Sequence, residues 1–192
     1  MPLHITDSQS VVVSFLIVLG VIIILGVFIA IRKARSKRIK AHFGTEYDRA
    51  VLEHGSAQAA ESRLSERETR VGAFKLRELS ATERERFLNE WNGIQARFLD
   101  HPRTAALEAD DLINSLLEAR GYPRGSFEQR AADISVTYPS VMENYRSAHS
   151  IAVRTGPQEA TTEELRTALI QYRGTFDYLL QVAKPVAVRT AA

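Results

Sequence analysis

The chain has 192 residues, with 25 Lys and Arg against 23 Asp and Glu, and it contains no cysteine. The lack of cysteine excludes a disulfide scaffold, thiol chemistry and cysteine-ligated zinc or iron–sulfur sites. The net charge of +2 is unevenly distributed, because six of the basic residues lie between positions 32 and 40 and leave the remainder slightly acidic. We therefore expect no nucleic-acid partner, since duplex binding needs a basic surface that neutralises phosphates.

Residues 11–31 form an apolar run without a charge, in which Ser14 is the only polar side chain. At about 1.5 Å per residue, a helix of this length matches the roughly 30 Å hydrocarbon core of a bilayer. A cleaved signal peptide would need a basic start, which residues 1–10 lack. A buried core helix rarely runs this long without interruption. The run predicts a transmembrane helix over 11–31.

The basic residues after this run predict its orientation, because Lys and Arg beside a membrane helix stay on the cytoplasmic side. They are Arg32, Lys33, Arg35, Lys37, Arg38 and Lys40. We expect residues 1–10 to be a short extracytoplasmic N-terminus, 32–45 to be a basic juxtamembrane segment, and the rest to be cytoplasmic. The cluster either sets topology alone or also contacts anionic lipid headgroups.

The next segment, 46–79, is predicted to be a polar helix or stalk. Its helical part reaches about Val71 with few large apolar residues, and Gly72 should end it. Charged residues between Glu61 and Arg70 alternate in sign, as on a solvated helix surface.

Residues 80–182 predict a bundle of about five helices, and no window alternates as a strand would. Three capping boxes mark helix starts, at Ser80 with Glu83, at Ser126 with Gln129, and at Thr161 with Glu164. Apolar residues follow each box at helical spacing, and Gly121 fits a left-handed residue after a helix end. The fold class is therefore all-α, with a disordered tail over 183–192.

The chain shows no motif for catalysis, for a cofactor or for a metal, so we assign no residues to these roles and expect a protein that is not an enzyme. His149 has no acid or nucleophile spaced to pair with it along the sequence. The acidic group Glu108, Asp110 and Asp111 is interpreted as a solvated helix face.

The segment from Gly121 to Arg146 is dense in aromatic, proline and charged residues. One interpretation is structural, with Tyr122 and Phe127 stapling a turn while Arg130 and Asp133 satisfy exposed helix caps. The other is an exposed recognition surface, since Tyr and Arg are common binding anchors. Its candidate residues are Tyr122, Phe127, Arg130, Asp133, Tyr145 and Arg146.

This segment, together with the stretch from Trp91 to Phe98 that reads WNGIQARF, resembles an uncharacterised family of bacterial single-pass membrane proteins with a small helical cytoplasmic domain. The resemblance covers most of residues 44–180. It implies a bacterial inner-membrane location and brings no activity, cofactor or catalytic residue.

These observations favour a membrane-tethered protein-interaction module with an unidentified protein partner, and homo-oligomers are possible. The alternative is a helical domain at the membrane surface that binds anionic lipid or a small ligand. An enzyme would require a convergent buried acid–base pair.

Overall fold

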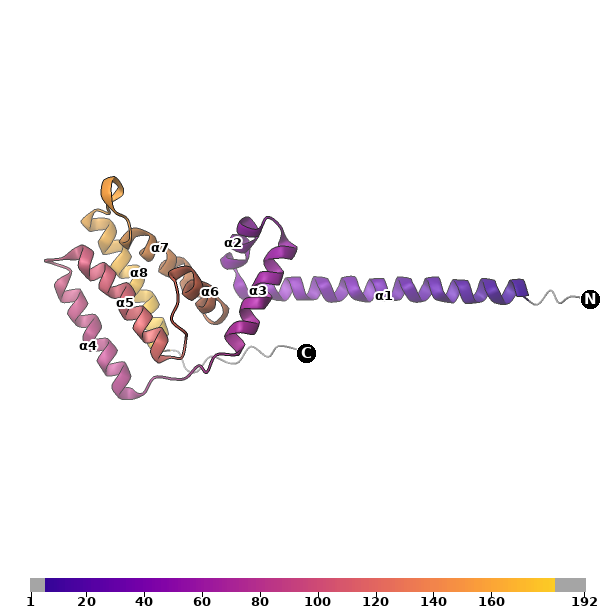
Figure 1. Ribbon diagram of the computed structural model, residues 1–192, viewed down its shortest axis with the longest axis horizontal. Helices are drawn as coiled ribbons and strands as arrows, with labels where there is room; N and C mark the ends of the chain where they lie inside the picture. Colours follow the sequence, from indigo (N-terminus) through magenta and orange to yellow (C-terminus); the bar gives the residue numbers. More distant parts are fainter. Residues whose placement is uncertain (1–5, 182–192) are drawn as a thin grey trace, which may run out of the picture. The chain divides into compact units, whose positions relative to one another are not determined.

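The computed structural model describes residues 6–181, and every regular element in them is helical (Figure 1). This confirms the predicted all-α fold class. The chain divides into two compact units, residues 1–42 and residues 43–192. The predicted tail over 183–192 lies outside the described residues, as do the first five residues of the predicted N-terminus.

The described part of the first unit is helical and belongs to α1, Thr6–Phe43, whose last residue is counted with the second unit and which contains the predicted membrane run. The described large apolar side chains from Val12 to Ile31 are exposed, from 42 % for Leu19 to 70 % for Ile24, whereas Ile39 and Phe43 near the end of the helix are buried. By length and composition, the part from Ser14 to Phe43 can cross a membrane. The helix continues without a break through most of the basic juxtamembrane segment and ends before Gly44, whose φ is 52°.

Two helices, not one, follow at the start of the second unit: α2 (Thr45–His54) and α3 (Ala57–Gly72), here called the hairpin. The prediction of one polar helix up to Val71 is wrong, because the helix is interrupted at Gly55. This glycine has a φ of 75° and its N–H donates to the Val51 carbonyl, which ends α2. The Ser56 side chain then accepts a hydrogen bond from the Ala59 N–H and caps α3.

Five α-helices form the bundle, as predicted. They are α4 (Ala81–Arg97), α5 (Pro102–Ala119), α6 (Phe127–Thr137), α7 (Met142–Ala152) and α8 (Thr162–Gln181). Short 3₁₀ turns, Pro139–Val141 and Gly156–Gln158, precede α7 and α8. Pro102 occupies the first turn of α5, where its missing N–H would have had no helical partner.

The capping boxes at Ser80 and Thr161 are complete, with the side chain and backbone of each bonded to the following glutamate. Only one of the two hydrogen bonds of the capping box at Ser126 forms. Its hydroxyl accepts from the Gln129 N–H, but the Gln129 amide donates to the Asp133 carboxylate instead of reaching back. The buried charge of Asp133 is the stronger acceptor.

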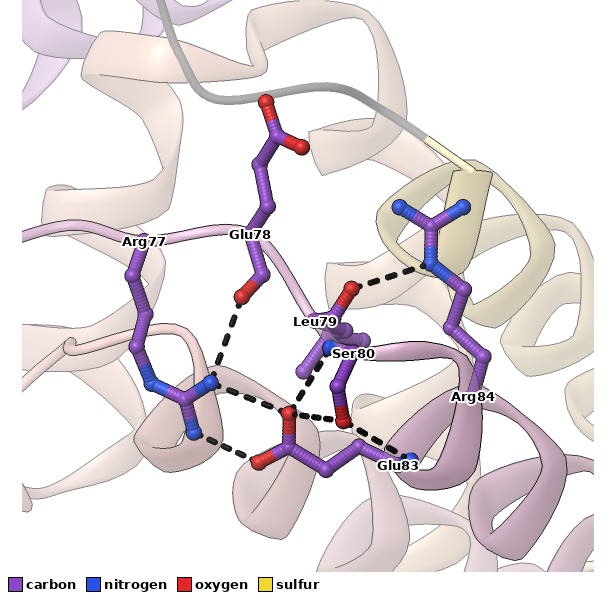
Figure 2. A network of polar contacts seen from close by, with 6 residues as sticks. All are labelled: Arg77, Glu78, Leu79, Ser80, Glu83 and Arg84. Atoms are coloured by element: carbon purple, nitrogen blue, oxygen red, sulfur yellow. Dashed lines mark hydrogen bonds and ion pairs between the residues drawn. The ribbon is translucent and has the colours of Figure 1, made fainter.

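The linker between α3 and α4 is held to the bundle through Arg77, by both its side chain and its backbone. Arg77 donates to both carboxylate oxygens of Glu83 at the start of α4 (Figure 2), and these bonds, with the Ser80 N–H, hold the pKa of Glu83 well below its usual range. The Arg77 N–H donates to the Arg120 carbonyl at the end of α5. Gly121 follows with a φ of 95°, and a Cβ there would lie 2.4 Å from the Lys75 carbonyl oxygen. The predicted left-handed residue is therefore confirmed, and the close approach of the linker requires glycine.

One apolar cluster fills the bundle and extends from Leu79 to Leu180. At its centre Trp91 of α4 stacks on Phe176 of α8, with ring centroids 4.9 Å apart. The hairpin has buried apolar residues of its own, but in the part of the chain that the structure describes they are not members of this cluster. They are Tyr47, Ala50, Ala60, Leu64 and Val71. The hairpin is thus a separate layer from the bundle core.

Candidate functional site between the hairpin and helices α6 and α7

The six residues predicted as an exposed recognition surface are largely covered. Tyr145 is fully buried, and Tyr122 and Asp133 are 5 % and 2 % exposed. The side chains of Arg130 and Arg146 are 16 % and 14 % exposed. The prediction of an exposed patch is therefore wrong, because the aromatic rings lie in or against the apolar cluster and the charged groups contact partners on other helices or on the turn before α6.

The turn after α5 matches the structural interpretation only in part, because Tyr122 and Arg130 hold the turn while Phe127 stacks on His149 and Asp133 pairs with Arg70. Tyr122 packs its ring against Phe74 of the linker and donates from its hydroxyl to Thr137 at the end of α6, at 2.9 Å. Burial raises the pKa of this hydroxyl. Arg130 donates to the Gly125 carbonyl at 2.6 Å, just before α6 begins. These contacts fix where α6 starts and how it is oriented.

An ion pair between Arg70 and Asp133 joins the hairpin to α6. Asp133 accepts from the Nε of Arg70 of α3 at 2.9 Å and also from an Nη of the same guanidinium. The Gln129 amide donates to both oxygens of the same carboxylate. Asp133 is thus a buried charge that is compensated by the hairpin, as buried carboxylates must be.

Helix α7 is joined to the hairpin in the same way. Arg146 donates from Nε and Nη2 to the two oxygens of Glu46 in α2, at 3.0 and 3.1 Å, and from Nη1 to Glu128 of α6 at 3.1 Å. Although burial opposes its charge, the pairing with Glu46 and Glu128 raises the pKa of Arg146 overall. We call the set Glu46, Arg70, Asp133 and Arg146 the seam.

A recess of about 280 Å³ lies in the seam. Its lining combines three arginines and two glutamates with small polar and apolar groups: Glu53, Arg67, Arg70, Ser126, Glu128, Gln129, Ala132 and Arg146. Arg67 differs from the other two arginines, because its guanidinium forms no ion pair or hydrogen bond with any residue that the structure describes. Burial lowers the pKa of Arg67, and the nearby carboxylates of Glu53 and Glu46 oppose that shift only in part.

Helix α6 also contributes to a second polar cluster, which lies inside the bundle and involves Phe127 and Arg130. The Asp110 carboxylate of α5 accepts from the Tyr172 hydroxyl at 3.2 Å and lies 3.4 Å from Nδ1 of His149 and 3.7 Å from an Nη of Arg130. The Phe127 ring stacks on the His149 imidazole at a centroid distance of 3.5 Å. Phe127 and Arg130 thus belong to this cluster, together with Tyr145, whose hydroxyl pKa is raised by burial and by Asp110.

The interpretation of Asp110 as part of a solvated face is wrong, and His149 lies near this acid although no acid is spaced to pair with it along the sequence. Asp110 is 9 % exposed. The signal was present in the sequence: Asp110 lies four residues after Ala106 and three before Ile113, on the apolar stripe of its helix. Its pairing with His149 links helices α5 and α7, which spacing along one helix could not reveal. Asp110 and His149 are a pair without a third metal-binding partner among the described side chains.

Arg120 was also missed. It is 1 % exposed, and it donates to the Leu179 carbonyl at 2.7 Å and to the Tyr138 hydroxyl at 3.0 Å. It connects the end of α5 to the end of α8. An arginine beside a helix end is a weak signal in a sequence, because most such residues are solvated.

The candidate lipid contacts lie on the first unit. All six basic residues from Arg32 to Lys40 are exposed side chains on α1. Arg32 also lies over the ring of Phe28, 5.9 Å from its centroid.

No family model, curated protein or solved structure matches this chain.

Proposed function

We propose that this protein is a membrane-tethered protein-interaction module. Helix α1 is the anchor, in a bacterial inner membrane as the family resemblance implies, with the helical domain on the cytoplasmic side. The recognition face consists of helices α6 and α7. The hairpin α2–α3 covers this face in the described state and is displaced when a partner binds.

One observation carries the proposal: the hairpin meets α6 and α7 through ion pairs and a recess, while the bundle has an apolar core to which the hairpin does not contribute. Polar contacts of this kind resemble those of exchangeable interfaces between domains. Charged groups of a partner can replace them at little net cost, because each broken pair is remade. A continuous apolar core could not be exchanged in this way.

The orientation follows from the charges on α1. The six basic residues follow the apolar part of the helix, and Lys and Arg in this position stay cytoplasmic. The domain is therefore exposed to cytoplasmic proteins, at the membrane surface.

We propose binding and not catalysis, although Asp110 and His149 form a buried acid–base pair. The lining of the recess includes neither residue, and Asp110 already has Tyr172, His149 and Arg130 around its carboxylate. In this proposal, an acid whose carboxylate faces a hydroxyl, an imidazole and a guanidinium of neighbouring helices serves helix packing.

The test is proximity labelling in bacterial cells with three full-length variants. In Arg70→Glu, repulsion from Asp133 opens the seam, so labelling of a reproducible set of partners should increase. In the exchange variant, Arg70→Asp with Asp133→Arg, the ion pair is restored and labelling should return toward the level of the unmodified protein. Arg63→Glu is the matched control, because Arg63 lies on the same helix and, among the described residues, forms its ion pair with exposed Glu66.

Equal labelling by all variants would contradict the proposal, because occupancy of α6 and α7 by the hairpin would then not control partner binding. If labelling rose equally in Arg63→Glu, the increase would come from the change of charge alone. That result would contradict the proposal as well.

A second candidate function is binding of anionic lipid, favoured by the exposure of all six basic side chains of α1. Each basic residue near an anionic surface contributes about 1 kcal/mol. Replacing Lys37 and Arg38 with Glu should weaken association with anionic lipid if this candidate holds. Unchanged association would exclude it.

A further inference from the structure

The seam defines what an occupant of α6 and α7 has to supply. Asp133 is 2 % exposed and is paired with a guanidinium, that of Arg70 on α3. Arg146 is paired with a carboxylate, that of Glu46 on α2, through both carboxylate oxygens. A protein that takes the place of the hairpin must therefore present one basic and one acidic group, on two neighbouring helices, in this arrangement.

The hairpin holds these two groups together by contacts of its own. Helices α2 and α3 pack against each other, and the Tyr47 hydroxyl of α2 donates to the Glu61 carboxylate of α3 at 3.2 Å. Ala60 and Leu64 of α3 are fully buried, yet neither is a member of the apolar cluster of the bundle. The hairpin therefore keeps its internal contacts, and the spacing of its charges, when it leaves the bundle.

The connection from the hairpin to the bundle is short. The ring of Phe74 packs against Tyr122, and Arg77 bonds to the start of α4 and to the end of α5, so the linker from Phe74 onward belongs to the bundle. Gly72 and Ala73, both exposed, lie between α3 and this part of the linker. Since glycine adopts many backbone conformations, the hairpin can turn about these two residues while the linker stays on its own bundle.

We propose that the hairpin also docks on α6 and α7 of a second copy of this chain, and that two copies exchange their hairpins reciprocally. The proposal rests on the proposed function, because the hairpin must first leave its own bundle. In the exchanged pair, Arg70 of each copy meets Asp133 of the other, and Glu46 of each meets Arg146 of the other. Each ion pair of the seam is thus remade between copies, which is why domain swapping is a low-cost route to dimers.

A second copy fits this face better than an unrelated protein does. Its hairpin carries the required guanidinium and carboxylate in the required arrangement, because it is the same hairpin. Helix α1, as the proposed anchor, confines all copies to one membrane in one orientation, which raises their effective concentration near one another. Because the closed chain and the exchanged pair make the same seam contacts, the density of the protein in the membrane decides between them.

The experiment uses the full chain, coexpressed with two different tags, extracted in a mild detergent and purified through one of them. The second tag should copurify with the unmodified protein. In Arg70→Asp, or in Asp133→Arg, present in both copies, like charges meet in the closed and in the exchanged form, so copurification should fall several-fold. Arg63→Asp is the matched control and should leave copurification unchanged, since Arg63 pairs with exposed Glu66 on its own helix.

The deciding arm combines one copy that carries Arg70→Asp with one copy that carries Asp133→Arg. Neither chain can close on itself without repulsion. Between the two chains, the introduced carboxylate meets the introduced guanidinium, and the other exchanged hairpin forms the original pair. Copurification should therefore return at least to the level of the unmodified protein. Glu46→Arg combined with Arg146→Glu repeats the test at the second ion pair, in case a variant at the first does not fold.

The proposal is overturned if unmodified copies do not copurify, or if Arg70→Asp copurifies as well as they do, because association would then lie elsewhere in the chain. It is also overturned if mixed pairs of folded variants fail to recover. Its failure is distinguishable from failure of the proposed function. If copies do not associate while labelling of other proteins rises in Arg70→Glu, the exchange between copies is wrong and the interaction function stands.

Discussion

The bundle and the hairpin hold their helices in place by different means. In the bundle, aromatic and aliphatic side chains such as Trp91, Phe176 and Ile113 are buried in one continuous cluster. At the seam, Arg70 with Asp133 and Arg146 with Glu46 connect α3 and α2 to the bundle through charges. Burial of apolar area is non-directional and adds up over many residues. Ion pairs are specific in direction but contribute little net stability, because desolvation opposes them. The bundle is therefore expected to be the stable part, and the hairpin the part that opens first.

The largest effect is expected from the bundle core. Trp91→Ala removes a fully buried ring that stacks on Phe176 and should lower the free energy of unfolding of the whole domain by about 3–5 kcal/mol. Chemical denaturation followed by circular dichroism measures this change. Leu99→Ala, at a site that is 85 % exposed, is the control and should change stability by no more than about 0.5 kcal/mol. A small loss in Trp91→Ala would show that the apolar cluster is not what holds the bundle.

The linker should come next. Gly121→Ala places a Cβ 2.4 Å from the Lys75 carbonyl oxygen and forces a left-handed φ on alanine, so a loss of about 2 kcal/mol or more is expected. Gly72→Ala is the matched control, because nothing lies within 4 Å of its added Cβ. The same denaturation experiment compares the two variants. Equal stability of both would mean that the linker moves aside without cost.

A smaller and local effect is expected at the seam. Asp133→Asn removes the charge that pairs with Arg70, which is itself partly exposed, so the loss should be about 1–2 kcal/mol and confined to hairpin docking. A double-mutant cycle with Arg70→Gln should give a coupling energy of about 0.5–2 kcal/mol. Hydrogen exchange of α2 and α3 is the measurement. Additive effects of the two substitutions would show that the pair does not hold the hairpin.

The smallest effect is a pH dependence at the start of α8. The Thr161 N–H, with Arg154 and the Thr161 hydroxyl, lowers the pKa of Glu164 to about 2 from its usual 4.5. Because the folded-state pKa is the lower one, this contribution is present above pH 4.5 and is lost as the pH falls toward 2. Glu164→Gln should therefore flatten the loss of stability over this range. Glu163→Gln, its exposed neighbour, should leave the acid profile as it is.

The helices of the bundle could be predicted from the sequence, whereas the polar contacts between helices could not. The presence of the bundle helices and the start of the bundle at Ser80 follow from local signals. Ser80 and Thr161 each cap the helix that begins directly after them, through a glutamate three residues later. The seam and the Asp110 cluster join residues that are far apart in the chain: Glu46 and Arg146 are 100 positions apart. No periodicity specifies which carboxylate meets which arginine. The composition between Gly121 and Arg146 indicated an unusual region. It did not indicate that the hairpin of the same chain would pair with the charged residues of this region.

We claim that the hairpin opens before the bundle. Native-state hydrogen exchange across the whole domain can decide this, because it measures the opening free energy of each helix in the unmodified protein. The claim predicts that amides of α2 and α3 exchange through an opening that costs less free energy than the opening of α4, α5, α7 and α8. Exchange of the hairpin and the bundle at one common free energy, through global unfolding alone, would contradict it.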